Sequence, residues 1–140
     1  MLSHQKCPCG SGDTYASCCE VFHNDIKAVE SVTQLLRARY SAFVLKYADF
    51  IQLTMMNPSL VHFDESDILN SPVKWHGLDI LAVEEGTKHD TQGVVEFRVT
   101  CSESAESNSL FSVRERSLFK YVDFQWFYVD ALDIEREELG

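Results

Sequence analysis

The stretch VEFRVTC (95–101) carries an apolar side chain at every second position, with Glu96, Arg98 and Thr100 between them. Successive side chains of a β-strand point to opposite faces, so a period of two is typical of a strand with one buried face. The stretch therefore predicts a half-buried strand, and the rest of the fold can be assigned outward from it.

Strand signals lie on both sides of this stretch. Residues 73–83 are rich in β-branched and aromatic side chains and precede a turn region at 85–90. Residues 110–121 and 124–134 are predicted as two further strands, joined by a tight turn at Val122-Asp123 and preceded by an acidic loop at 102–108. Together the four strands predict an antiparallel meander. The charged tail IEREELG (134–140) is expected to fray or to form one helical turn.

A long helix is predicted ahead of the strands. Asn24-Asp25 can cap a helix, and apolar residues then recur at spacings of three and four: Val29, Val32, Leu36, Tyr40, Phe43 and Tyr47. This pattern predicts an amphipathic helix of roughly 20 residues. A shorter helix is expected at 49–55, ended by Pro58, and a loop with a short helical turn at 57–72. Helices followed by strands indicate an α+β domain with the long helix packed on a curved sheet.

Composition and charge restrict the partners of the chain. Its 140 residues are 45% hydrophobic, and no run approaches the roughly 20 apolar residues of a membrane span. The net charge of −10, with basic residues spread along the chain, disfavours binding to nucleic acid or to an anionic membrane. The beginning MLSHQKCPCG has no apolar segment of the signal-peptide kind, so we expect a cytoplasmic location. The oligomeric state stays open.

Four of the five cysteines are clustered near the beginning of the chain: Cys7, Cys9, Cys18 and Cys19. Without an export signal, such clustering indicates metal or redox chemistry before disulfides. Four thiolates suit the tetrahedron of a closed, structural zinc site, and Gly10 and Gly12 allow the sharp turn that two ligands one residue apart require. We therefore predict one structural Zn²⁺ on these four residues. A vicinal Cys18-Cys19 disulfide and unliganded thiols are the alternatives; the spacing does not match iron–sulfur runs.

Two resemblances follow from longer segments. CPCGSGDTYASCC (7–19) resembles the SEC-C motif, the zinc-binding element at the C-terminus of the SecA translocation ATPase. Further segments are similar to the bacterial YchJ-like family, which joins SEC-C motifs to a nuclear transport factor 2-like (NTF2-like) domain: LLRARYSAFVLKYADF (35–50), KWHGLDI (74–80), GVVEFRV (93–99), RERSLF (114–119) and QWFYVDA (125–131).

The resemblances imply a zinc motif over 1–24 and a cone-shaped NTF2-like α+β domain over 25–140. They do not imply the partners of SecA, because Asp13 stands in a gap where the SecA motifs carry lysines. YchJ-like proteins often have a second SEC-C motif at the C-terminus, and none is found at 134–140.

Cone-shaped domains of this kind often hold a ligand pocket, and the resemblance directs attention to the polar and aromatic residues that would line it: Arg39, Trp75, His76, Glu115, Arg116, Trp126, Tyr128 and Asp130. Each has a plain structural alternative. Arg39 and Glu115 would equally suit an ion pair between helix and sheet, and Trp126 and Tyr128 would suit the core. No spacing of nucleophile and base stands out, which disfavours an enzyme.

Three function hypotheses remain at this level. The leading one is a cytoplasmic zinc-binding adaptor that contacts a protein partner through the zinc motif. The alternative is a small-molecule-binding protein, or a lyase- or isomerase-type enzyme, that uses the cone pocket. A ligand found in a pocket lined by Glu115 or Arg116 would favour this alternative, and a pocket filled by its own aromatic side chains would count against it. A redox sensor at the cysteine cluster is the third hypothesis.

Overall fold

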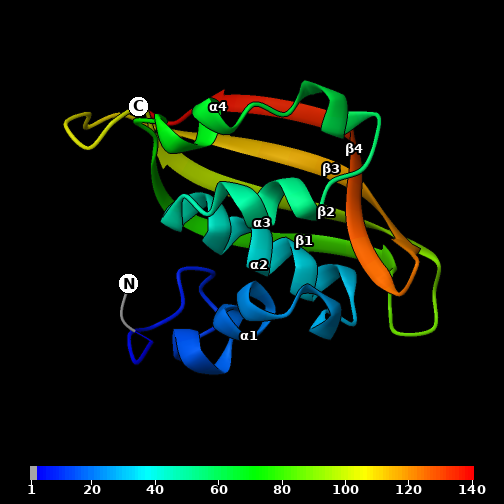
Figure 1. Ribbon diagram of the computed structural model, residues 1–140. Helices are drawn as coiled ribbons and strands as arrows, with labels where there is room; N and C mark the ends of the chain where they lie inside the picture. Colours follow the sequence, from blue (N-terminus) through cyan, green and yellow to red (C-terminus); the bar gives the residue numbers. More distant parts are fainter. Residues whose placement is uncertain (1–2) are drawn as a thin grey trace.

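The computed structural model describes residues 3–140, in which helical segments precede a single antiparallel sheet (Figure 1). The helical elements are η1 (Tyr15–Ser17), α1 (Cys19–Asn24), η2 (Ile26–Ala28), α2 (Val32–Leu45), α3 (Ala48–Leu53), η3 (Ser59–His62) and α4 (Glu65–Leu69). The strands are β1 (Lys74–Glu85), β2 (Gln92–Ser102), β3 (Leu110–Val122) and β4 (Gln125–Glu138). The predicted α+β class and four-stranded meander are confirmed.

The sheet has the order β1-β2-β3-β4, and each strand is antiparallel to its neighbour. It curves around α2 and α3, which lie on its concave side (Figure 1). The expectation of a frayed or helical tail was wrong, because β4 continues to Glu138. The tail is held by pairing with β3, where Leu139 N donates to Leu110 O over 2.8 Å.

The predicted start of the long helix was also wrong. Helix α2 begins at Val32, where the Ser31 hydroxyl accepts a hydrogen bond from Gln34 N over 3.2 Å. Asp25 instead caps the short η2. Helix α2 ends at Leu45, because Lys46 after it has a left-handed φ of 62°, so the helix has 14 residues rather than roughly 20. The spacing of apolar residues gives no information on this local capping, which decides where a helix begins.

The segment between α3 and β1 was predicted as a loop with a short helical turn. The structure places two helical elements there, η3 and α4, which lie above α3 in Figure 1, while α2 lies below it. Asp64 caps α4 by accepting a hydrogen bond from Ser66 N. These short elements cover part of the concave face of the sheet.

The core lies between α2 and the concave face of the sheet. Its largest fully buried side chains include Trp126, Phe119, Leu35, Ile51, Val32 and Val95. The turn between β1 and β2 packs on the beginning of α2: Gly86 has a φ of +79°, and an added Cβ would lie 2.5 Å from Val32 Cγ1. Within residues 3–140, no helix is long and apolar enough to cross a membrane.

Candidate functional site

The four clustered cysteines form one compact group. The Sγ atoms of Cys7, Cys9, Cys18 and Cys19 all lie within 4.8 Å of one another. Cys7, Cys9 and Cys19 are buried, and Cys18 is half-buried. The chain therefore brings the predicted ligand atoms together within a short, largely enclosed segment.

A tight turn makes this convergence possible. Gly10 and Gly12 have φ values of 79° and 92°, a left-handed region that favours glycine. Gly10 N donates to Cys7 O over 3.2 Å, and Cys7 N donates to Asp13 O over 2.9 Å. The chain thus reverses between Cys9 and Thr14, and η1 then leads to the second pair of cysteines.

The thiol spacing fits a tetrahedral metal site. Four sulfurs about 2.3 Å from one ion in a tetrahedron lie about 3.8 Å apart. The Cys9 and Cys18 sulfurs are 3.6 Å apart, and those of Cys18 and Cys19 are 3.9 Å apart. A disulfide needs about 2.0 Å, so the vicinal Cys18-Cys19 disulfide is absent here, and all the cysteines are free.

The thiols of the cluster differ in pKa, because their hydrogen bonds and their burial differ. Interaction with the Cys19 thiol lowers the pKa of Cys9 to about 4, while burial raises the pKa of Cys18 to about 11. The Ser11 hydroxyl lies 3.2 Å from Cys18 Sγ, and the Ser41 hydroxyl lies 3.5 Å from Cys7 Sγ. Hydroxyl groups in these positions can donate to thiolates and so support metal ligands.

Polar contacts fasten the cysteine segment to α2. Arg37 donates from Nη1 to Cys9 O over 2.9 Å. His23 Nε2 lies 2.8 Å from Ala38 O, and His23 Nδ1 lies 2.6 Å from the Tyr15 hydroxyl. A carbonyl oxygen only accepts, so Nε2 carries the proton, and in the neutral ring Nδ1 accepts from Tyr15. Burial lowers the pKa of His23, which favours this neutral form.

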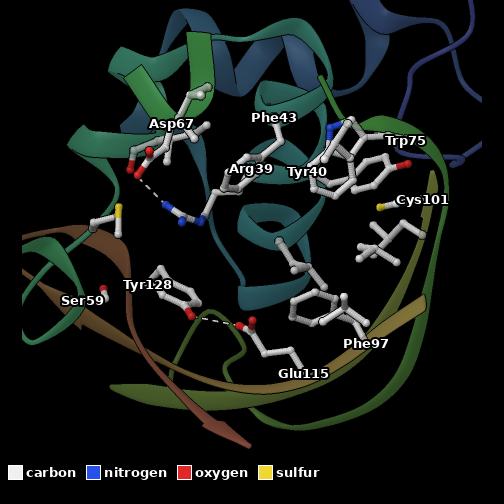
Figure 2. Close-up of a pocket in the computed structure, with 18 of the residues that line it drawn as sticks. Arg39, Tyr40, Phe43, Ser59, Asp67, Trp75, Phe97, Cys101, Glu115 and Tyr128 are labelled. Carbon is white, nitrogen blue, oxygen red and sulfur yellow. Dashed lines mark hydrogen bonds between the residues drawn. The ribbon is translucent and has the colours of Figure 1, made fainter. Parts of the chain in front are cut away.

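A cavity of about 530 Å³ lies on the concave side of the sheet, between α2, the η3–α4 segment and strands β1 to β4 (Figure 2). Its apolar lining residues are Leu36, Phe43, Ile51, Met55, Phe63, Ile68, Val73, Trp75, Leu78, Phe97, Val99, Phe111 and Val113. Its polar or reactive ones are Arg39, Tyr40, Ser59, His62, Asp64, Asp67, Cys101, Glu115 and Tyr128. The aromatic side chains form walls around the space and leave it open.

Arg39, Tyr128 and Glu115 form the polar part of the cavity wall (Figure 2). The Tyr128 hydroxyl donates to Glu115 Oε2 over 2.9 Å, and the Arg39 guanidinium carbon lies 4.6 Å from the centre of the Tyr128 ring. Ser117 also donates to Glu115 Oε2. The suggested Arg39–Glu115 ion pair is not formed, because the two side chains do not approach within 4.0 Å. Burial raises the pKa of Tyr128.

The cavity brings together some of the predicted pocket residues and not others. Arg39, Trp75, Glu115 and Tyr128 line it, and His76, Arg116, Trp126 and Asp130 do not.

Three of these residues are absent from the lining because of register shifts in the strands or because they lie on the opposite face of the sheet. His76 falls in a register shift between Trp75 and Gly77 and bonds to Ser102 Oγ over 3.0 Å. Asp130 follows a second shift, since Tyr128 pairs with Phe119 but Asp130 pairs with Leu118. An extra residue in a strand moves later side chains to the opposite face. Arg116 pairs with Glu84 over 2.7 Å on the face opposite Glu115.

Trp126 has a different reason for its absence from the lining. It is 1% exposed and belongs to the hydrophobic core, where its ring stacks on Tyr121 with a centroid separation of 5.4 Å. Its position agrees with the structural alternative for this residue.

Sequence reasoning missed the contribution of the η3–α4 segment. Ser59, His62, Asp64 and Asp67 line the cavity, although Ser59 is only half-buried and the other three residues are exposed to solvent. In the sequence they resemble ordinary loop and helix-capping residues, as the hydrogen bond from Ser66 N to Asp64 illustrates. Their position over the concave sheet depends on the path of the chain after α3, for which the sequence carries no local signal.

Comparisons with known proteins agree with this architecture. A family model described as "YchJ, middle NTF2-like domain" matches residues 31–131, and the SEC-C motif matches residues 5–20. A UPF0225 protein of Photorhabdus laumondii is 33% identical over 134 residues, covering 91% of this chain and 80% of the relative. One of Deinococcus radiodurans is 37% identical over 130 residues, covering 92% and 90%.

Two solved structures are similar in fold. The solution structure of RPA3114, a SEC-C motif containing protein from Rhodopseudomonas palustris, has a TM-score of 0.76 and 27% identity, covering 92% of this chain and 98% of its own. A SEC-C motif containing protein from Psychrobacter arcticus has a TM-score of 0.73 and 25% identity, covering 91% and 82%. The chain therefore belongs to the YchJ-like UPF0225 family and combines a SEC-C motif with an NTF2-like domain.

Proposed function

We propose that this chain is a small-molecule-binding protein whose ligand occupies the cone cavity and whose SEC-C segment is a structural zinc site. The observation that carries the proposal is the open cavity of about 530 Å³. Its size falls in the range of about 300–1,000 Å³ typical of small-molecule sites, and an apolar lining with few polar groups is usual for them.

Binding is favoured over catalysis by the polar groups of the cavity. The hydrogen-bonded titratable pair in the described lining is Tyr128 and Glu115. Because burial raises the pKa of Tyr128, its hydroxyl stays protonated at neutral pH and is a poor general base. We therefore assign these residues to ligand contact and not to a chemical step.

Zinc is the metal that best suits the cysteine cluster. Four thiolates form a soft ligand set, and near-tetrahedral spacing of the sulfurs favours Zn²⁺ over ions that prefer oxygen ligands. With four protein ligands no coordination position is left for a substrate, so the role of the ion is structural. Free thiol ligands also require a reducing compartment, which supports a cytoplasmic location.

The zinc site would support the cavity through α2. Arg37 bonds to the cysteine segment, and Arg39 and Tyr40, two and three residues later, line the cavity. Zinc binding therefore stabilises the segment packed against the outer face of a helix whose inner face forms the pocket.

An adaptor role is the second candidate. It is favoured by the exposure of residues 10–14, which leaves the turn of the SEC-C segment accessible to another protein. The test is a pull-down with wild type and a Cys18→Ser, Cys19→Ser variant, with zinc measured in both. Retention of every partner after loss of zinc would exclude the adaptor role of the zinc-bound segment.

The cavity is tested with N-phenyl-1-naphthylamine, a neutral apolar probe that fluoresces in apolar surroundings. Val113 lines the cavity, so Val113→Trp should fill it and abolish the fluorescence increase. Val83 lies outside the lining and is 45% exposed, so Val83→Trp is the matched control and should leave binding unchanged. Unchanged probe binding by a folded Val113→Trp variant would refute the cavity as the site.

A further inference from the structure

Arg39 is a buried cation in the wall of the cavity. Its side chain extends from α2, and the residue is only 6% exposed. Its Nη1 atom donates to Ile51 O over 3.0 Å and to Thr54 Oγ1 over 2.8 Å. Thr54 is itself fully buried, and its carbonyl accepts a hydrogen bond from Tyr128 N over 2.7 Å. The guanidinium is therefore held in a fixed position by α3 and β4.

The guanidinium has no acidic partner in the described part of the chain. None of the ion pairs within 4.0 Å involves Arg39, and its Nε and Nη2 atoms have no acceptor among residues 3–140. No described side-chain nitrogen or oxygen is both sealed from solvent and unbonded, so these two nitrogens keep some accessible surface, and Arg39 is a lining residue of the cavity. Burial lowers the pKa of Arg39 to about 10, so it remains a cation at neutral pH.

Neighbouring rings compensate this charge only in part. The guanidinium carbon lies 4.6 Å from the Tyr128 ring centre and 6.0 Å from the Phe43 ring centre. Such contacts attract a cation, but they supply no hydrogen-bond acceptor in the plane of the guanidinium. Glu115 attracts the Arg39 charge from beyond 4.0 Å, but it forms no bond to the guanidinium, and its Oε2 accepts from the hydroxyls of Tyr128 and Ser117. A buried charge without a bonded counter-ion is unfavourable and would gain from an anionic ligand.

The other residues that line the cavity indicate the charge and the polarity of its ligand. Arg39 is the one arginine, and no lysine accompanies it, among the described residues around the cavity. Glu115, Asp64 and Asp67 add negative charge, which repels phosphates and other multiply charged anions more strongly than an anion with a single charge. Most other lining side chains are aliphatic or aromatic, including Trp75, Phe97 and Val99. These features select one negative charge on an apolar body.

We propose that the cone cavity binds a small apolar monocarboxylate, with the carboxylate on Arg39 and the hydrocarbon part against the apolar walls formed by α2 and the concave sheet. The proposal rests on the proposed function, because it requires a cavity that accepts small molecules. A carboxylate matches the guanidinium fork in geometry and accepts two parallel hydrogen bonds, here from Nε and Nη2.

The experiment compares octanoate with octan-1-ol, its neutral analogue of equal chain length, as competitors of N-phenyl-1-naphthylamine. Octanoate should displace the probe from wild type at about 10- to 100-fold lower concentration than octan-1-ol, since a charge-assisted pair is added. This comparison needs no variant. Equal potency of the two competitors, or an advantage of the alcohol, would overturn the proposal.

Substitution then locates the effect. Arg39→Met keeps much of the apolar volume and should remove the advantage of octanoate over octan-1-ol, with both competitors measured on the same variant. Arg39→Lys retains charge without the planar fork and should show an intermediate advantage. A folded Arg39→Met variant that still prefers octanoate would refute the assignment.

The two proposals fail in different ways. If neither the probe nor octan-1-ol binds wild type, the cavity takes no apolar molecule and the proposed function fails. If both bind but octanoate has no advantage, only the carboxylate specificity fails.

Discussion

His23 should make the stability of this protein depend on pH. Its ring links α1 to α2: Nε2 donates to Ala38 O over 2.8 Å, and Nδ1 accepts from the Tyr15 hydroxyl over 2.6 Å. The ring of Phe50 packs on it with a centroid separation of 4.7 Å. A protonated ring would carry a second N–H toward Tyr15 and a charge into buried surroundings. Burial therefore lowers the pKa of His23 in the folded state, although the carboxylate of Glu20 acts in the opposite direction.

The sign of the effect follows from proton binding. Below the ordinary histidine pKa of about 6.5 the unfolded chain binds a proton that folded His23 resists, so the free energy of unfolding falls as pH falls. Protonation of the unfolded histidine between pH 7.5 and pH 5.5 limits the stability that this one group can remove to about 1.4 kcal/mol. The contribution is fully present above the unfolded pKa.

The assay is urea unfolding of wild type and His23→Gln at pH 7.5, 6.5 and 5.5, with bound metal measured at each pH. Protonation of the cysteine ligands affects both proteins, so the difference between them isolates His23. The variant should be the less stable protein at pH 7.5, and the difference should shrink toward pH 5.5, by at most about 1.4 kcal/mol. His89→Gln, at an exposed position, is the control and should run parallel to wild type. A His23→Gln curve that also stays parallel to wild type would refute the buried neutral histidine.

Three further perturbations probe other contacts. Gly86→Ala should lower the free energy of unfolding by about 2–4 kcal/mol, because a Cβ at φ +79° is strained and would lie 2.5 Å from Val32 Cγ1; the double variant with Val32→Ala should show less than the summed loss in urea unfolding. Ser31→Ala removes the cap of α2 and should lower the free energy of unfolding by about 1 kcal/mol in urea unfolding; full retention of stability would contradict a capping role for Ser31. Ser41→Ala removes the hydroxyl 3.5 Å from Cys7 Sγ and should weaken zinc binding about tenfold in a chelator competition, and equal zinc affinity would contradict a role for this contact.

The elements of the fold were largely predictable because their signals are local. The alternation at 95–101 identified β2, and the turn residues around 85–90 and 122–123 separated the neighbouring strands. The boundaries were less predictable. Ser31, and not Asp25, begins the long helix, and β4 continues through a charged tail because β3 offers it pairing partners. Charge in a sequence does not reveal whether a neighbouring strand is available.

The cavity was predictable only in part. The resemblance named Glu115 and Tyr128, which line the cavity, but also Arg116, which lies on the opposite face of β3. It also named His76 and Asp130, which are absent from the lining because single-residue register shifts in β1 and β4 alter which face the side chains occupy. A bulge arises from pairing between two strands, so one strand read by itself cannot reveal it.

The sequence by itself determined the convergence of Cys7, Cys9, Cys18 and Cys19, since ligand spacing and glycine turns act within one short segment. It also determined the order of helices and strands, because hydrophobic period is a local property. Only the tertiary structure decided that the cone is open and that Arg39 lines it with no acidic partner within 4.0 Å among residues 3–140. Those features depend on how α2, α3 and the curved sheet meet, through contacts between residues far apart in the chain.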